Sequence, residues 1–207
     1  MNEILSEQLR PTNFDDLILD QKIKNKLKNM LETRDVMSMI FFGEPGCGKT
    51  TAAKIFADSE NFTSITVNGS LDTSVDAIRN KIENFSTSVS FDGTPKICLI
   101  DEADYLSKNA QAALRRVIEK SSSNCRYIFT ANAIEKIDSA LRSRLLEIRF
   151  DFTATQKKEA LESYVSKLFE KLSKNYADFD KDRIRQLVIS SFPDYRAIAN
   201  KIEFEFI

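Results

Sequence analysis

The sequence predicts an α/β fold, in which a five-stranded parallel sheet is flanked by helices and followed by a small helical domain. Five short apolar runs alternate with helical patterns up to residue 150, and beyond that point the strand-like runs stop. A chain of 207 residues can bury one core, or one core and a small satellite domain. We therefore expect one domain over residues 1–150 and a second over residues 151–207.

The predicted strands are apolar runs bounded by residues that are typical of turns. They are expected at Met39–Phe42, Ile65–Val67, Ile97–Ile100, Tyr127–Thr130 and Leu145–Phe150. Because helical patterns lie between most of these runs, the strands are expected to be parallel and joined by crossover helices.

The segment after the last strand has the spacing of helices. Apolar residues over 161–172 recur at helical intervals behind two candidate N-caps, Thr153 and Thr155. A second helix is predicted over 182–190, and a third is predicted to begin near Pro193, a residue suited to a first helical turn. These patterns predict that the second domain is helical.

The composition is that of a folded protein and excludes several classes. With 42% hydrophobic and 29% charged residues, wholesale disorder is excluded. The net charge of -1 gives no general attraction to nucleic acid, so any DNA contact must be a local patch. Three cysteines without histidine exclude the common zinc spacings. The N-terminus lacks a signal-peptide pattern and no apolar run reaches roughly 18 residues, so we expect a cytoplasmic chain without a membrane partner.

A glycine-rich segment after the first strand has the pattern of a phosphate-binding loop. A helix-prone stretch follows the loop, whose residues are Gly43-Glu44-Pro45-Gly46-Cys47-Gly48-Lys49-Thr50-Thr51. In such a loop the backbone N–H groups converge on phosphate oxygens, and the N-terminus of the next helix adds favourable potential. Lys49 is expected to reach the β- and γ-phosphates and Thr50 to ligate magnesium. An accidental glycine-rich turn is the alternative, but the flanking strand and helix favour nucleotide binding.

Adjacent carboxylates end the third predicted strand, which reads Ile97-Cys98-Leu99-Ile100-Asp101-Glu102-Ala103-Asp104. Alone, this is the pattern of any buried strand with a solvated acidic end. Behind a phosphate loop, Asp101 is expected to hold the magnesium shell, and Glu102 to orient and polarise an attacking water. The pair favours hydrolysis over binding alone. A phosphotransferase would also need an acceptor pocket, for which the sequence gives no signal.

Two later segments supply further candidates. Thr130-Ala131-Asn132 places an amide where an open α/β sheet collects its ligands, so Asn132 is a candidate contact of the γ-phosphate. Asparagine at a strand end is otherwise a common turn former. Arg142 and Arg144 precede the last strand. An arginine there is either a solvated edge charge or a finger presented to the nucleotide of a neighbouring subunit.

In this order, the motifs resemble those of an AAA+ ATPase, and specifically of a DNA-polymerase sliding-clamp loader subunit. The likeness covers nearly the whole chain through Leu9–Leu17, Val67–Ser70, Ala110–Glu119 and Phe192–Arg196. Ser88–Gly93 and Phe192–Arg196 are most similar to the large ATPase subunit of tailed-phage clamp loaders. Members of that family continue into a collar domain. The chain stops at Ile207 within a predicted lid helix, so the collar is expected to be missing.

The resemblance implies a role for each candidate residue. Lys49 and Thr50 would bind phosphates and Mg²⁺, Asp101 would bind the metal, and Glu102 would be the base. Asn132 and Arg196 would be sensors of the bound ATP, and Arg144 would act in trans on the ATP of an adjacent subunit. The remaining nucleotide contacts would be Arg10, Pro11, Glu44, Pro45, Gly46, Cys47, Gly48 and Thr51.

The implied function is ATP-dependent loading of the sliding clamp onto primer–template DNA, within a ring of like and unlike clamp-loader subunits. The location would be the cytoplasm, or the host cytoplasm if the chain is viral. Candidate contacts to the duplex backbone are Arg79, Lys108 and Arg115, although exposed basic residues on helices are more often solvated. Two alternatives stay open: a helicase loader or other oligomeric AAA+ ATPase acting on DNA, and a nucleotide-gated assembly module that does not hydrolyse ATP.

Overall fold

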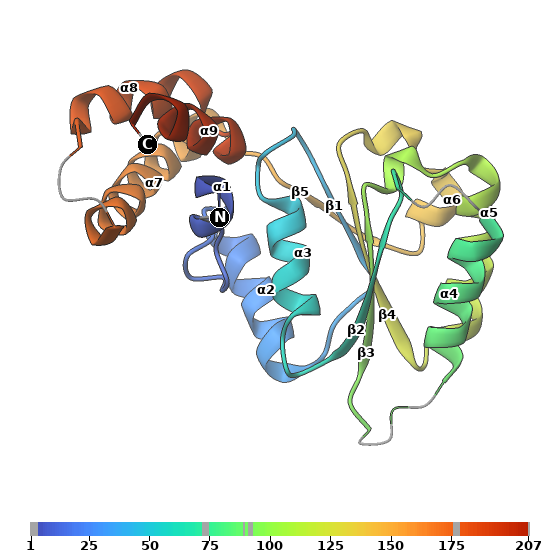
Figure 1. Ribbon diagram of the computed structural model, residues 1–207. Coiled ribbons are helices and arrows are strands. Elements are labelled where there is room, and N and C mark those ends of the chain that lie inside the picture. The colour runs from blue at the N-terminus through green and yellow to red at the C-terminus, as the bar shows by residue number, and fades with distance from the viewer. Residues whose placement is uncertain (1–3, 72–74, 89, 91–92, 176–178, 207) are drawn as a thin grey trace.

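The computed structural model describes residues 4–71, 75–88, 90, 93–175 and 179–206, and it confirms the predicted α/β fold (Figure 1). Its five-stranded sheet is parallel throughout, in the order β2-β3-β4-β1-β5. The strands are β1 (Met39–Phe42), β2 (Thr63–Asn68), β3 (Lys96–Asp101), β4 (Cys125–Ala131) and β5 (Leu146–Arg149). The central strands are buried on both faces, which is why they are nearly continuous apolar runs in the sequence.

Helices cover both faces of the sheet (Figure 1). One face carries α2 (Gln21–Thr33) and α3 (Lys49–Ala57), and the other carries α4 (Val75–Thr87), α5 (Lys108–Ser121) and the short α6 (Ser139–Arg142). Short 3-10 turns, η1 (Ala103–Tyr105) and η2 (Ile134–Lys136), follow β3 and β4. Each face has its own apolar cluster, which includes Leu27 and Phe56 on the first face and Ile82 and Leu114 on the second.

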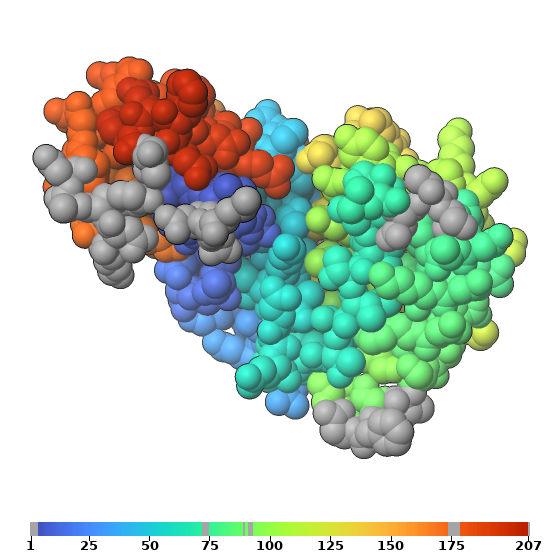
Figure 2. Space-filling model, in the orientation of Figure 1, coloured from blue at the N-terminus to red at the C-terminus, as the bar shows by residue number. Residues whose placement is uncertain are grey.

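The chain after β5 is helical, as predicted, and consists of α7 (Ala154–Asn175), α8 (Lys181–Ser191) and α9 (Tyr195–Phe206). In Figure 2 these helices form the orange and red lobe beside the sheet domain. Thr153 is the N-cap of α7, because its hydroxyl accepts from Gln156 N (3.4 Å) while Thr153 N donates to Gln156 Oε1 (3.0 Å). Thr155 lies inside the helix.

The third helix begins near Pro193, as predicted, but the proline lies outside it. Helix α9 begins at Tyr195, two residues after Pro193. Asp194 caps it, because its Oδ1 accepts from Ala197 N at 2.9 Å. Pro193 is therefore not in the first turn, since the capping carboxylate follows the proline.

The N-terminal segment contacts the helical domain. Helix α1 (Leu5–Gln8) lies beside α9, and Leu5 and Ile18 belong to the apolar cluster of the helical domain (Figure 1). Leu5 N donates to Glu203 Oε1 at 3.2 Å, and Lys171 Nζ donates to Leu9 O at 3.2 Å. This segment therefore packs on both parts of the chain, while the boundary near residue 151 stays a prediction.

Cys47, Cys98 and Cys125 are free and buried, and burial raises the pKa of all three thiols. Within the described ranges, no helix combines the length and the apolar character that a membrane crossing requires.

A buried hydroxyl in β4 supports the sheet away from its carboxyl edge. Tyr127 OH shares a hydrogen bond of 2.5 Å with Ser121 Oγ at the end of α5, and burial raises the pKa of Tyr127 to about 12. We expect Tyr127→Phe to lower the free energy of unfolding by about 1 kcal/mol, because one net hydrogen bond is lost. Urea denaturation measures this change, and Tyr105→Phe, at an exposed tyrosine, is the control. Identical midpoints for Tyr127→Phe and wild type would contradict the prediction.

Candidate nucleotide-binding site

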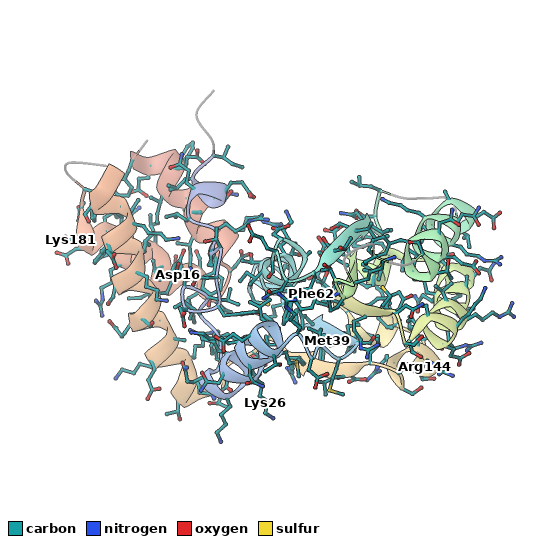
Figure 3. The ribbon with its side chains drawn as sticks, turned by 90° about the horizontal axis from the view of Figure 1, so that it is seen from below. Asp16, Lys26, Met39, Phe62, Arg144 and Lys181 are labelled. Carbon is teal, nitrogen blue, oxygen red and sulfur yellow. The ribbon has the colours of Figure 1, made fainter. Side chains whose placement is uncertain are left out.

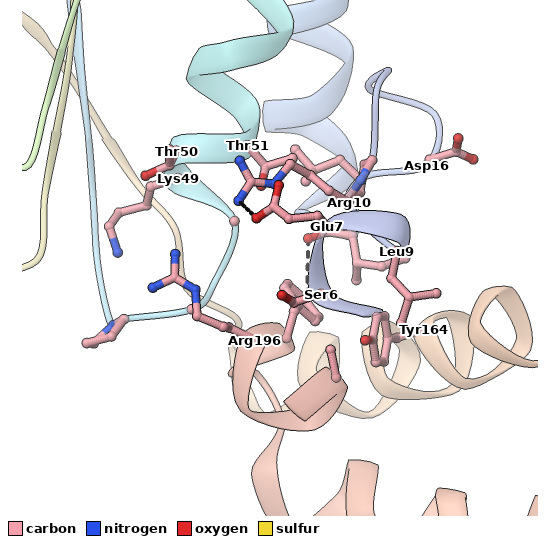
Figure 4. A pocket seen from close by; sticks show the side chains of 18 of the residues that line it. Ser6, Glu7, Leu9, Arg10, Asp16, Lys49, Thr50, Thr51, Tyr164 and Arg196 are labelled. Carbon is pink, nitrogen blue, oxygen red and sulfur yellow. Dashed lines mark hydrogen bonds and ion pairs between the residues drawn. The ribbon is translucent and has the colours of Figure 1, made fainter. Parts of the chain in front are cut away.

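A pocket lies at the carboxyl ends of the central strands, between the sheet and the helical domain (Figure 4). This is where open α/β sheets collect ligands. Of the residues predicted from the sequence, the pocket is lined by Arg10, Pro11, Pro45, Gly46, Gly48, Lys49, Thr50, Thr51, Glu102, Asn132 and Arg196. The fold therefore gathers segments from the whole length of the chain into one site.

The phosphate loop joins β1 to α3. Gly48 is the N-cap of α3, with φ of 95° in the left-handed region that favours glycine, and it opens the N-terminus of the helix toward the pocket. Lys49 is buried, and its Nζ donates to Gly43 O at 2.9 Å and to Glu44 O at 2.7 Å. Its ammonium group is thus held inside the curve of the loop.

Two predicted loop contacts lie outside the pocket wall. Glu44 is exposed and offers its backbone carbonyl to Lys49. Cys47 is buried, with its Sγ 3.7 Å from Lys49 Nζ. The loop turns the Glu44 side chain outward and the Cys47 side chain inward, so neither is on the pocket wall. A nucleotide contact from either residue would come from its backbone and stays a prediction.

The acidic end of β3 faces α3 and β4. Asp101 Oδ1 accepts hydrogen bonds from Thr50 Oγ1 at 2.8 Å and from Thr130 Oγ1 at 2.5 Å. Asp101 is not on the pocket wall itself. Its hydrogen bond with Thr50 joins it to a residue that lines the pocket. Glu102 follows in the left-handed region, with φ of 54°, and it lines the pocket.

A glycine after β2 makes room for the Glu102 turn. Gly69 N donates to Asp101 O at 2.8 Å, and a Cβ at Gly69 would lie 2.5 Å from Glu102 O. Any larger residue would displace the backbone of Glu102. This contact gives a physical reason for the glycine in the Val67–Ser70 stretch.

The two expected sensors come from opposite sides of the pocket. Asn132 follows β4, and Arg196 lies in the first turn of α9. Tyr195 N donates to Gly46 O at 3.1 Å, so α9 begins directly against the phosphate loop. Figure 4 shows the side chains of Lys49 and Arg196 at the same end of the pocket.

The rest of the wall was missed in the sequence. Helix α7 contributes Tyr164, Lys167, Leu168 and Lys171, whose spacing places them on one helical face. That spacing was visible, but it indicates a core-facing helix as readily as a pocket. The N-terminal segment adds Ser6, Glu7, Leu9, Asp16, Leu17 and Ile18, β4 adds Thr130 and Ala131, and α9 adds Tyr195 and Ala199.

Arg10 lies between the loop and the N-terminal helix. Its NH2 group pairs with Glu7 Oε1 at 2.5 Å, and both residues line the pocket (Figure 4). The predicted N-terminal contact Arg10 is thus held beside α1, and Figure 4 shows its side chain next to Thr51, while Pro11 also lines the pocket.

Arg144 lies away from this pocket. It precedes β5, and Leu146 N donates to Ser38 O at the start of β1, whereas the phosphate loop follows the end of β1. Its Nε donates to Glu119 Oε1 at 2.8 Å. In Figure 3, Arg144 and the pocket residue Asp16 lie at opposite sides of the view. The fold therefore does not bring Arg144 to the nucleotide site of its own chain.

The candidate DNA contacts lie on the helical layer formed by α4 and α5. Arg79 on α4 is exposed, and its Nε lies 3.5 Å from Glu83 Oε2. On α5, Lys108 is exposed in the first turn, and Arg115 NH1 lies 3.9 Å from Asp138 Oδ1. None of the three lines the pocket.

A buried glutamine joins three segments around the site. Gln111 Nε2 donates to Leu106 O and Lys136 O, both at 3.1 Å, and its Oε1 accepts from Asp138 N at 2.7 Å. These partners lie after the Glu102 turn, after the Asn132 loop and at the N-cap of α6. One side chain therefore joins the segments that follow Glu102 and Asn132 to the segment that leads to Arg144.

Comparisons with known proteins agree with this architecture. The family model described as "ATPase family associated with various cellular activities (AAA)" matches residues 39–154. The replication factor C small subunit of Archaeoglobus fulgidus is 31% identical over 207 residues, which covers 97% of this chain and 63% of that protein. Replication factor C subunit 3 of Schizosaccharomyces pombe is 39% identical over 150 residues, covering 70% and 44%. The chain thus spans less than two thirds of the length of these relatives.

The solved structures show the same fold. The Thermotoga maritima RuvB Holliday junction branch migration motor has a TM-score of 0.71 and 23% identity, and the match covers 95% of this chain and 64% of that one. The likeness to tailed-phage subunits stays a prediction, because the relatives named above are archaeal and eukaryotic. Part of Ser88–Gly93, which carried that likeness, lies outside the described residues.

Proposed function

The chain belongs to the AAA family of ATPases, and we propose that it binds ATP with Mg²⁺. We propose further that it hydrolyses this ATP as a subunit of a sliding-clamp loader. The observation that carries the proposal is the pocket itself, where the phosphate loop, Glu102, Asn132 and Arg196 meet. The relatives named as replication factor C subunits support a role in DNA replication.

The residues at the phosphate end suit a magnesium ion. Mg²⁺ prefers oxygen ligands and usually keeps water and substrate phosphates in its shell, so it needs few protein ligands. The Thr50 hydroxyl and the Asp101 carboxylate, 2.8 Å apart, provide such oxygens. When bound, the ion would neutralise charge on the β- and γ-phosphates. Within the described ranges, no group of three or more acidic, histidine or cysteine side chains gathers into a metal site.

Other residues of the pocket would bind the phosphates and activate the attacking water. The Lys49 ammonium would bind the phosphates, and Glu102 would accept a proton from the attacking water. Asn132 and Arg196 would contact the γ-phosphate from the sheet and from the helical domain. Because α9 begins on the phosphate loop, the position of Arg196 would follow the state of the nucleotide.

The position of Arg144 supports a finger that acts in trans. We expect Arg144→Ala to lower ATP turnover in the assembled ring by about 10³-fold, the lower range for such fingers. Arg142→Ala is the matched control, because Arg142 ends α6, two residues before Arg144, and pairs instead with Glu147 (2.8 Å).

A mixing experiment separates trans from cis action. Arg144→Ala keeps its own pocket, and Lys49→Ala keeps its finger, so a mixed assembly of the two is expected to regain part of the turnover that each lacks alone. If the mixture is no more active than the sum of its parts, Arg144 does not act on a neighbour.

The proposed partners are further copies of this chain, other clamp-loader subunits, the sliding clamp and primer–template DNA, with the cytoplasm as the proposed location. Arg79, Lys108 and Arg115 are proposed to contact the duplex backbone, which requires no sequence readout. The test is ATP turnover by the assembled subunits on different DNAs. Stimulation by primer–template DNA with the clamp supports a clamp loader, whereas stimulation by single-stranded DNA without the clamp would instead indicate a helicase loader.

A further inference from the structure

Thr130 lies on β4, beside the acidic end of β3, and lines the pocket. It is 2% exposed, and its single hydroxyl makes two hydrogen bonds. Oγ1 donates to Asp101 Oδ1 at 2.5 Å and accepts from Glu102 N at 3.0 Å. A hydroxyl has one proton and two lone pairs, so it can make both bonds at once. One atom thus contacts the proposed metal ligand and the backbone of the proposed base.

The backbone of Glu102 is held in a conformation that non-glycine residues seldom adopt, with φ of 54°. Such a conformation persists only where the surroundings enforce it. Here the bond from Glu102 N to Thr130 holds one side of the residue, and Tyr105 N donates to Glu102 O at 3.1 Å on the other. The hydroxyl of Thr130 therefore helps to set the direction in which the Glu102 side chain leaves the turn.

The Asp101 carboxylate is oriented from two sides. Its Oδ1 accepts from Thr50 on α3 and from Thr130 on β4, so the helix after the phosphate loop and the neighbouring strand fix it together. Without Thr130, the Asp101 carboxylate would keep the Thr50 contact and lose its restraint from β4.

The same strand leads to Asn132, two residues after Thr130. On the far side of Asn132, Ala133 N donates to Asp104 Oδ2 at 3.3 Å. Asp104 is 8% exposed. Asn132 thus lies between two links to the turn that carries Asp101 and Glu102. The hydrogen bonds of Thr130 and Ala133 therefore set the distance of Asn132 from Asp101 and Glu102.

We infer that Thr130 is a positioning residue for ATP hydrolysis. Its hydroxyl holds the Asp101 carboxylate and the Glu102 backbone in a fixed position relative to Asn132. The inference rests on the proposed function. A hydroxyl with a purely structural role would affect stability alone. The two partners of Thr130 are instead the proposed metal ligand Asp101 and the backbone of the proposed base Glu102. Loss of the hydroxyl would therefore change the affinity for Mg²⁺ and the rate of ATP turnover.

The decisive variant is Thr130→Val, which keeps the shape of the side chain and removes the hydroxyl. Outer groups that orient metal ligands typically contribute about 10–100-fold to metal affinity or activity. We expect the Mg²⁺ concentration that half-saturates binding of a non-hydrolysable fluorescent ATP analogue to rise by about tenfold, and kcat to fall by about 10–100-fold. Thr130→Ser restores the hydroxyl and is expected to restore both values.

Tyr127→Phe is the control, because it removes a buried hydroxyl from the same strand at a site outside the pocket. It is expected to lose stability and to keep the Mg²⁺ dependence of wild type. If Thr130→Val is insoluble, Thr130→Ala takes its place with the same expectation. The inference is overturned if the hydroxyl-free variant keeps the Mg²⁺ dependence and kcat of wild type, or if serine gives no rescue.

The binding measurement also separates this inference from the function on which it rests. Wild type that binds the analogue with Mg²⁺ and yet never hydrolyses ATP with clamp and DNA would remove the proposed function. The shift in Mg²⁺ dependence between threonine and valine would still decide whether Thr130 orients the metal site.

Discussion

Lys49→Ala is expected to remove most of the affinity of the chain for ATP. In the structure, the Lys49 ammonium is held by the carbonyls of Gly43 and Glu44 inside the phosphate loop, so it is already placed where phosphates would arrive. A charged hydrogen bond contributes about 1.5–3 kcal/mol, and two such bonds to phosphate oxygens correspond to a change in Kd of about 100-fold or more.

Fluorescence titration with an ATP analogue measures this loss. Lys54→Ala is the matched control, because Lys54 lies on the same helix and does not line the pocket. Far-UV circular dichroism of both variants checks that α3 is retained. Binding by Lys49→Ala within threefold of wild type, about 0.6 kcal/mol, would show that the loop is not the phosphate site.

Glu102→Gln is expected to abolish turnover and to leave ATP binding nearly unchanged. The amide has the shape of the carboxylate and cannot accept the proton of the attacking water, so kcat is expected to fall by about 10²–10⁴-fold. The backbone bond from Glu102 N to Thr130 and the space provided by Gly69 are kept in this variant.

Release of phosphate by the assembled subunits measures the effect, and binding of the ATP analogue is measured in parallel. Glu32→Gln is the control, because it makes the same chemical change at an exposed acid on α2, outside the pocket wall. Equal background rates for wild type and Glu102→Gln would favour the alternative of a nucleotide-gated module that does not hydrolyse ATP.

The central strands β1, β3 and β4 could be predicted because burial on both faces leaves continuous apolar runs. The edge strands β2 and β5 are more exposed, and their bounds differ from the predicted Ile65–Val67 and Leu145–Phe150. The bounds of β1 agree with the prediction, but β3 begins at Lys96, one residue earlier. Lys96 is 5% exposed, and its Nζ donates to Phe85 O at 2.9 Å and to Ser88 Oγ at 2.7 Å. A buried lysine of this kind depends on hydrogen-bond acceptors at the end of α4, which the local apolar pattern of β3 does not reveal.

The phosphate end of the pocket could be predicted because its residues form short motifs with fixed spacing. The opposite end was missed because it joins segments that are far apart in the sequence. Tyr164 and Leu168 come from α7, and Leu17 comes from the N-terminal segment, which packs against the helical domain. The position of Arg144 likewise required the strand order, because only the pairing of β5 with β1 shows which end of the sheet it occupies.

We propose that this pocket hydrolyses ATP in response to its partners. The rate of phosphate release by wild type and Glu102→Gln, each assembled with partner subunits and measured with and without the sliding clamp and primer–template DNA, tests this proposal. Clamp and DNA together are expected to stimulate the wild-type rate and to leave Glu102→Gln at background. Stimulation of equal size in both assemblies would show that Glu102 is not needed for the response.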